Sequence, residues 1–168
     1  TANLRDEFAR FPSGKVLLVG NGPSITDNPF GAVIDSFDGP VVRFNRFQLK
    51  PVECTGTRVD LWVVRYSFTT NAIDKWPDHD KARAHLLTRF PRDLRFDDKG
   101  RKHSSGVATM LWCLREGFSV ILHGFDHFRE DRPVHYYPYH LVETHPQDKE
   151  TVGRYIEDGY PIRRFQNV

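Results

Sequence analysis

The sequence lacks several features that would assign it to a special class of protein. It has no run of 18 or more apolar residues and opens with a polar, charged segment, so it predicts neither a membrane-spanning helix nor a signal peptide. Its first residue is not Met, which leaves an upstream anchor open. Its only two cysteines, Cys54 and Cys113, have no metal-binding spacing, which favours buried free thiols in a reducing compartment. The 24 basic and 22 acidic residues nearly balance, which argues against a dedicated nucleic-acid binder.

The pattern of apolar residues predicts the fold. A chain of 168 residues is expected to form one domain over residues 1–168, with a core that needs no disulfide or metal. Short apolar runs alternate with helical segments, which is typical of an α/β fold: a Rossmann-like, mostly parallel sheet with helices on both faces. We expect strands at 16–19, 40–44, 59–64, 85–90, 119–123 and 162–165, and helices at 78–84, 104–116 and 146–157.

Ligands of such sheets bind beyond the carboxyl ends of the strands. Asn21 follows the first expected strand and Asn45 follows the second. The fifth expected strand leads into a loop at 124–144, which is unusually long for a compact domain and rich in aromatic residues. Such loops are usually functional or disordered, and the aromatic content favours function.

The segment Gly20–Ile25 invites comparison with the dinucleotide fingerprint G-x-G-x-x-G. Ile25 stands where the third glycine would be, and Pro23 removes an amide that a pyrophosphate would use. The second strand ends in Asn45 rather than in an acidic residue. A plain tight turn would explain the glycines but not Asn21. A nucleotide whose ribose or single phosphate is held by amides and asparagine side chains fits better than NAD.

The segment 102–106 opens a helix that Ser104 can cap, and the amides beyond Ser104 form a potential anion site. By itself this segment is better explained as a serine N-cap and nothing more.

Five of the eight histidines lie between His123 and His145. Histidine is the natural general base near neutral pH, and His145 stands directly before the helix expected to begin at Pro146. A helix N-terminus disfavours the cationic form of a neighbouring imidazole, and Glu150 could orient the ring. The alternative is that His145 merely caps the helix. We expect His123, His127 and His140 to be loop or packing residues.

No metal site is predicted. Asp78-His79-Asp80 has the D-x-D form that holds divalent cations in many glycosyltransferases, but it follows Trp76-Pro77 rather than a strand, which favours a solvated capping role. His123 and His127 are separated by a turn at Gly124 and share no helix face. The sequence also contains no G-x-S-x-G nucleophile elbow.

Taken together and in order, these segments resemble a sialyltransferase. Residues 15–45 resemble the large motif of the eukaryotic-type sialyl-motif family, and equally the start of the bacterial bifunctional sialyltransferases. Residues 104–126 resemble the small motif, and His135-Tyr136-Tyr137 resembles the third motif. His145 with Glu150 matches the very small H-x₄-E motif.

For the donor, the resemblance implies a site for a CMP-activated sugar. Asn21 and Asn45 would contact its phosphate, ribose or sugar. Ser105 and Gly106 would hold the cytidine or the sugar carboxylate. Arg43, Arg46 or Lys102 could add positive potential for the phosphate and the carboxylate.

For catalysis, the resemblance implies that His145 is the base. His135, together with Tyr136, would bind the departing phosphate. Ser104 and Glu150 would support these groups.

The activity implied is that of an inverting, metal-independent glycosyltransferase of modified GT-A fold, needing no cofactor. It would move sialic acid from its CMP donor to a glycan or glycolipid hydroxyl, with no nucleic-acid partner and with peripheral membrane association left open. Lys15 and Gly117 stand where the animal enzymes carry a disulfide, as expected of a bacterial cytoplasmic protein. Kdo as the donor sugar and a non-catalytic nucleotide-binding module stay open as alternatives.

Overall fold

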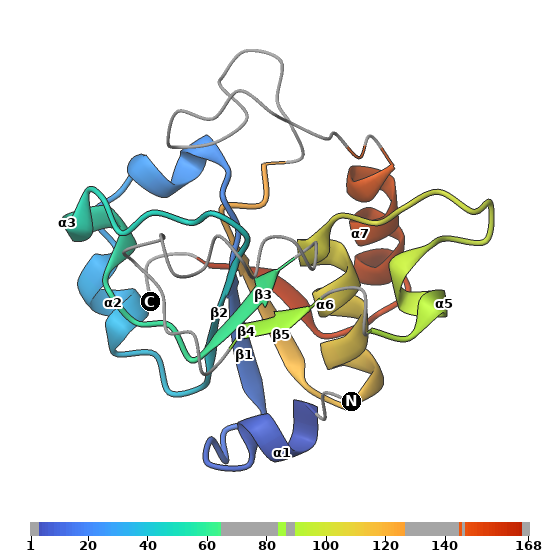
Figure 1. Cartoon of the computed structure of the whole chain (residues 1–168), viewed down its shortest axis with the longest axis horizontal. Coiled ribbons are helices and arrows are strands. Elements are labelled where there is room, and N and C mark those ends of the chain that lie inside the picture. The colour runs from blue at the N-terminus through green and yellow to red at the C-terminus, as the bar shows by residue number, and fades with distance from the viewer. Residues whose placement is uncertain (1–3, 65–83, 87–89, 127–144, 146, 166–168) are drawn as a thin grey trace.

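The computed structural model describes residues 4–64, 84–86, 90–126, 145 and 147–165. Within these ranges, six strands form one sheet in the order β4-β3-β2-β1-β5-β6, and every neighbouring pair is parallel (Figure 1). The strands are β1 (Lys15–Val19), β2 (Val41–Phe44), β3 (Leu61–Val64), β4 (Ala84–Leu86), β5 (Ser119–His123) and β6 (Ile162–Arg164). The predicted α/β class is therefore confirmed.

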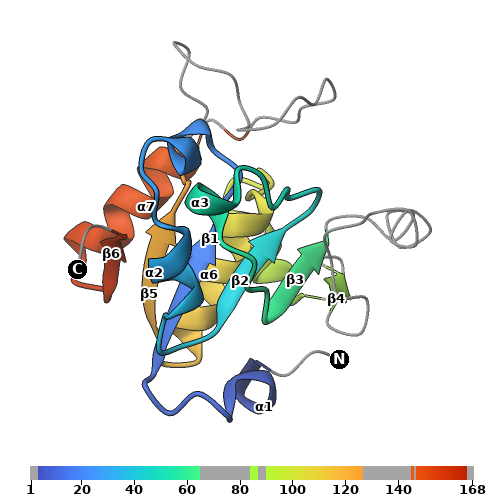
Figure 2. The ribbon, with the colours of Figure 1, turned by 90° about the vertical axis from the view of Figure 1, so that its left-hand side faces the viewer.

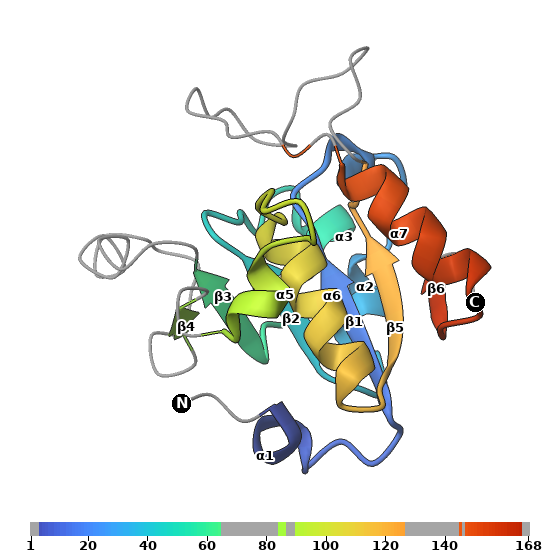
Figure 3. The same ribbon diagram turned by 90° about the vertical axis from the view of Figure 1, so that its right-hand side faces the viewer.

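Helices cover both faces of the sheet. The short helices α2 (Gly31–Asp35) and α3 (Val52–Thr55) lie on one face, as Figure 2 shows. On the other face lie α5 (Arg92–Arg95), α6 (Ser105–Arg115) and α7 (Asp148–Glu157), seen in front of the sheet in Figure 3. Helix α1 (Leu4–Phe8) lies near the amino end of β1 (Figure 1).

Alternate residues of the central strands supply two cores. Leu18 and Val42 pair in register and belong to the larger core, which also contains the apolar side of α6. Their neighbours Leu17 and Val41 also pair and belong to the core on the α2 face. Strands β1, β2, β3 and β5 are buried on both faces, which explains their continuous apolar runs.

Some boundaries differ from those expected. Strand β4 begins one residue earlier than predicted and is described only to Leu86. Phe90, expected in that strand, packs instead against the ring of Trp112 on α6, with 4.4 Å between ring centroids. The expected helix at 78–84 lies outside the described residues except for Ala84, which belongs to β4.

The two cysteines are buried and free, as predicted. Cys113 lies inside α6 among core residues, and burial raises the pKa of its thiol well above the ordinary value. It therefore packs as a small apolar side chain rather than acting as a nucleophile.

Candidate functional site

The site is organised by two loops that leave the central strands β1 and β5. The sheet pairing continues past both strands: the Gly20 amide donates to the His123 carbonyl at 2.7 Å, and the Gly22 amide to the Gly124 carbonyl at 2.8 Å. A Cβ at Gly20 would lie 2.7 Å from the Gly124 oxygen, and one at Gly22 would overlap Asp126. The glycines therefore serve the close approach of two chain segments. Their amides are occupied, so they do not form the pyrophosphate cradle of a dinucleotide fold.

Asn21 bridges the ends of β1 and β2. Its side-chain Nδ2 donates to the Phe44 carbonyl at 3.0 Å. Its Oδ1 is buried and has no hydrogen-bond partner among the described residues. Because buried polar atoms are rarely left unpaired, this oxygen is a candidate acceptor for a ligand N–H or O–H.

Asn45 connects the end of β2 to the start of α6. Its backbone has a positive φ of 50°, which asparagine tolerates better than most residues. The backbone is held from two sides, because its amide donates to the Val63 carbonyl at 2.8 Å and its carbonyl accepts from the Trp62 indole at 2.6 Å. The side chain is thereby aimed at α6, where Nδ2 donates to Ser105 Oγ at 3.4 Å.

The N-terminus of α6 is capped as predicted. Ser104 adopts an extended conformation, and its hydroxyl accepts from the Val107 amide at 3.2 Å. The amides of Ser105 and Gly106 are in the first turn, where no intrahelical acceptor exists. A Cβ at Gly106 would lie 2.5 Å from the Phe125 ring, so glycine is required for this helix end to pack on the loop after β5.

His145 is tied to the segment that precedes α6. Its Nδ1 lies 2.9 Å from the Lys102 carbonyl oxygen, which also accepts from the Gln147 side chain. A carbonyl can only accept, so Nδ1 carries the proton and the lone pair of the neutral ring lies on Nε2. The side chain is 5% exposed, which restricts its movement.

Helix α7 begins at Asp148, two residues later than predicted. Gln147 is its N-cap residue, and the Asp148 amide donates to the His145 carbonyl in a preceding turn. The Gln147 side chain donates to the Lys102 carbonyl, a long-range contact that sequence alone does not reveal. His145 still lies within one turn of the helix N-terminus.

Two residues near His145 were missed by the sequence reasoning: Asp148 and His103, both nearly fully buried. Burial raises the pKa of Asp148, and this is opposed by hydrogen bonding from Ser104 and by the proximity of His145 and His103. Burial lowers the pKa of His103, and the Asp148 carboxyl opposes that shift. Asp148 Oδ1 and His103 Nδ1 have no hydrogen-bond partner among the described residues. The spacing of Asp148, three residues after His145, was the available signal.

Other predicted residues lie elsewhere. Glu150 is exposed on α7, so the buried carboxyl beside His145 belongs to Asp148. Arg43 is 1% exposed, and its guanidinium donates to the carbonyls of Arg58 at 2.9 Å and Thr55 at 2.5 Å, which anchors the segment after α3. Its expected contribution to a phosphate site stays a prediction. His135, Tyr136, Tyr137, His127, His140 and the Asp78-His79-Asp80 segment lie outside the described residues.

Within the described ranges, no three His, Cys, Asp or Glu side chains come together as a potential metal site. No helix there has the length and apolar character needed to cross a membrane.

Comparison with known proteins identifies structural neighbours only. No protein-family model and no curated protein sequence matches the chain. A crystal structure of a mammalian sialyltransferase in complex with Gal-beta-1-3GalNAc-ortho-nitrophenol matches with a TM-score of 0.57 and 16% identity, over 92% of this chain and 70% of that one. A second mammalian sialyltransferase structure matches with a TM-score of 0.57 and 17% identity, over 92% and 69%. At such identity the likeness shows a shared fold.

Proposed function

We propose that this chain is a glycosyltransferase that moves sialic acid, or a related keto-acid sugar, from a CMP donor to a glycan hydroxyl. Three hydrogen bonds at the carboxyl edge of a sheet with a sialyltransferase-like fold carry the proposal. They join Asn21 to the end of β2, Asn45 to Ser105, and His145 to the segment before α6. These residues come from four segments of the sequence, and their order along the chain is that of the sialyl motifs.

The donor is held by two kinds of group. The unpaired Oδ1 of Asn21 accepts from a hydroxyl or amino group of the cytidine. The first-turn amides of Ser105 and Gly106 offer N–H groups and the positive end of a helix dipole, which suit the phosphate or the sugar carboxylate. The Asn45 side chain orients Ser105 through its hydrogen bond to the Ser105 hydroxyl.

The acceptor hydroxyl loses its proton to His145. With Nδ1–H donated to the Lys102 carbonyl, Nε2 is the nitrogen that takes the proton as the hydroxyl attacks the anomeric carbon. The imidazolium that forms is stabilised by the nearby Asp148 carboxyl. The bond to the CMP phosphate breaks as the new glycosidic bond forms, and His135 with Tyr136 is proposed to receive the departing phosphate.

The inverting course and the absence of a metal requirement belong to the same proposal. The proposal leaves two candidate donor sugars, sialic acid and Kdo, because both are keto-acid sugars carried by CMP.

Titration calorimetry with CMP, CMP-sialic acid and CMP-Kdo tests the donor. We expect CMP to bind and one CMP-sugar to bind more tightly than the other, which assigns the donor. A wild-type chain that binds none of the three would overturn the proposal.

Transfer from the preferred donor to Gal-beta-1-3GalNAc-ortho-nitrophenol tests the reaction, because a structural neighbour binds this compound. His145→Ala should lower transfer about 10²- to 10⁴-fold while CMP binds within about twofold of wild type. The matched control is Lys149→Ala, an exposed position near the start of α7. Undiminished CMP release by His145→Ala would show that His145 is not the base. CMP binding without transfer to any glycan would favour a nucleotide-binding module.

A further inference from the structure

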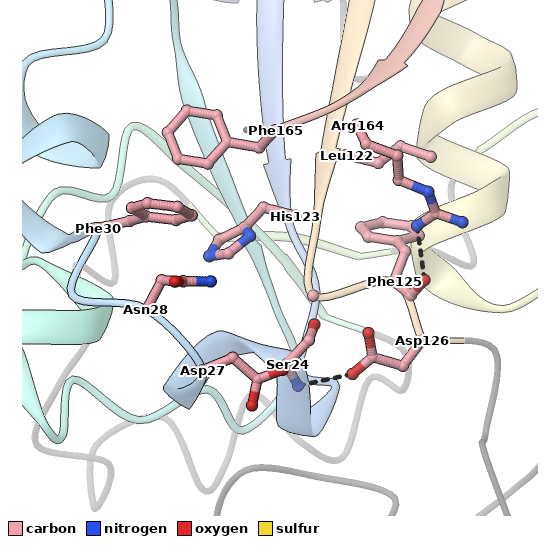
Figure 4. A pocket seen from close by; sticks show the side chains of 11 residues that line it. Ser24, Asp27, Asn28, Phe30, Leu122, His123, Phe125, Asp126, Arg164 and Phe165 are labelled. Atoms are coloured by element: carbon pink, nitrogen blue, oxygen red, sulfur yellow. Dashed lines mark hydrogen bonds between the residues drawn. The ribbon is translucent and has the colours of Figure 1, made fainter. Parts of the chain in front are cut away.

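A pocket of about 370 Å³ lies on the face of the sheet opposite α6, at the carboxyl end of β5 (Figure 4). Its walls come from the end of β5, the segment 24–30 and the end of β6. This segment begins within the short helix η1 (Pro23–Thr26). The volume falls in the range typical of small-molecule sites. None of the residues assigned above to the CMP donor or to catalysis lines it.

His123 projects into this pocket between aromatic rings (Figure 4). Its imidazole centroid lies 5.8 Å from that of Phe30 and 5.2 Å from that of Phe165. The side chain is 7% exposed, and its Nε2 has no hydrogen-bond partner among the described residues. A ligand that supplied a hydrogen bond to this ring would remove the cost of the unpaired nitrogen.

The charged groups around the pocket disfavour an anion. Asp27 and Asp126 contribute two carboxylates, against one guanidinium from Arg164, which already donates to the Phe125 carbonyl at 2.7 Å. Burial lowers the pKa of His123 to about 4, so its ring adds no positive charge at neutral pH. A phosphate or a sugar carboxylate would therefore meet a net negative surface.

The same groups suit a neutral sugar ring. The Asp27 and Asp126 carboxylates, the Asn28 amide and the His123 ring offer acceptors and donors for hydroxyl groups. The Phe30 and Phe165 rings offer an apolar surface for the C–H face of the sugar. One apolar wall with a few convergent polar groups is the usual composition of a specific small-molecule pocket.

The pocket also lies next to the proposed donor site. Phe125 connects the two, because its ring packs against Gly106 at the start of α6 while the residue lines the pocket. Gly124, the residue before it, contacts the chain at Gly20 and Gly22. The two sites are thus separated only by the crossing of the β1 and β5 loops.

We propose that this pocket binds one neutral ring of the glycan acceptor. This proposal rests on the proposed function, because only a glycan-modifying enzyme would place such a subsite beside its donor.

Saturation-transfer NMR of the full chain with the methyl glycosides of galactose, glucose, N-acetylgalactosamine and N-acetylglucosamine tests the proposal. We expect at least one glycoside to bind the wild-type chain. His123→Phe keeps a ring of similar shape without its nitrogens, and Asn28→Trp fills the pocket from an exposed position. Each should weaken glycoside binding at least fivefold while CMP affinity, measured by calorimetry, stays within twofold. Val33→Ser, on the exposed side of α2, is the control and should change neither.

Three outcomes would overturn the assignment. In the first, the wild-type chain binds none of the glycosides. In the second, both variants leave glycoside binding unchanged. In the third, the variants weaken CMP binding as much as they weaken glycoside binding. The last would show that the pocket serves the nucleotide. Failure of the proposed function is distinguishable, because there the wild-type chain would not bind CMP or a CMP-sugar, whatever the glycosides do.

Discussion

At the scale of single residues, unpaired buried polar atoms mark both candidate sites. Among the described residues they are Asn21 Oδ1, His103 Nδ1, His123 Nε2 and Asp148 Oδ1. Each such atom costs about 1–3 kcal/mol of folding free energy when no ligand satisfies it. All four lie near the carboxyl edge of the sheet, where a parallel α/β protein binds its ligands. These free-energy costs are therefore concentrated at positions where a bound ligand can supply the missing hydrogen bonds.

His123 makes stability depend on pH. Its folded pKa of about 4 lies below the ordinary 6.5, so the unfolded chain takes up a proton first as the pH falls. The contribution of His123 to stability is complete above pH 6.5 and is lost between pH 6.5 and about 4, by on the order of 3 kcal/mol. His123→Phe should remove this part of the pH dependence. Urea denaturation of both proteins at several pH values measures it, and parallel curves would contradict the assignment.

The ionised Asp148 carboxylate is expected to lower the stability of the fold and to raise the rate of transfer. Because burial raises its folded pKa, the ionised carboxyl destabilises the fold increasingly as the pH rises through that pKa. Asp148→Asn should therefore melt at a higher temperature than wild type at neutral pH, with a gap that closes in acid. The same variant should transfer sugar about tenfold more slowly, a loss of roughly 1.4 kcal/mol, because the His145 imidazolium loses its counter-charge.

The control for Asp148→Asn is Asp158→Asn, at the exposed C-terminal end of α7. Equal activity of Asp148→Asn and wild type would assign Asp148 to structure alone.

At the scale of elements, Asn45 joins β2 to α6 through its backbone and its side chain separately. Asn45→Gly loses the hydrogen bond to Ser105 but accommodates the positive φ without strain. Asn45→Ala loses the same hydrogen bond and also strains the backbone at this φ. Both variants should bind CMP more weakly by calorimetry. Asn45→Ala should also unfold about 1–2 kcal/mol more easily than Asn45→Gly, since alanine resists this conformation. Equal stability of the two would show that the backbone conformation carries no strain.

The longer elements were predictable, and the short helices were not. Sequence periodicity placed α6 and α7 within two residues at each end, because ten or more residues repeat a helical pattern over several turns. Helices α1, α2, α3 and α5 have four or five residues, too few to show a period. They are formed by tertiary packing, as Leu94 of α5 in the main core illustrates.

The candidate site divides in the same way. Asn21, Asn45 and Ser104 were predictable because each follows a strand or precedes a helix, and the fold brings such positions together. The association of His145 with Lys102 and His103 was not predictable, since it joins segments 43 residues apart in the chain. The pocket around His123 likewise depends on β6, at the far end of the described sequence, closing on β5.

At the scale of the whole molecule, β1 and β5 lie side by side in the middle of the sheet although most of the chain separates them. Their pairing runs from Lys15–Ser119 to Val19–His123 and continues to Ser24, whose amide donates to the Asp126 carboxylate 102 residues away. Contacts of such sequence separation are entropically costly to form, which slows folding.

This pairing has a consequence for the nascent chain. Residues 1–118 contain Asn21, Asn45 and the capped start of α6, yet they lack β5, which pairs with β1, and Phe125, whose ring packs against Gly106. A nascent chain that ends there would carry Asn21, Asn45 and Ser105 without the loop after β5 that packs against Gly20, Gly22 and Gly106. We expect a fragment ending at Phe118 to bind no CMP by calorimetry, and addition of a peptide covering residues 119–168 to restore binding. Under the proposed function, ligand recognition would thus be acquired in one step, when residues 119–168 are synthesised.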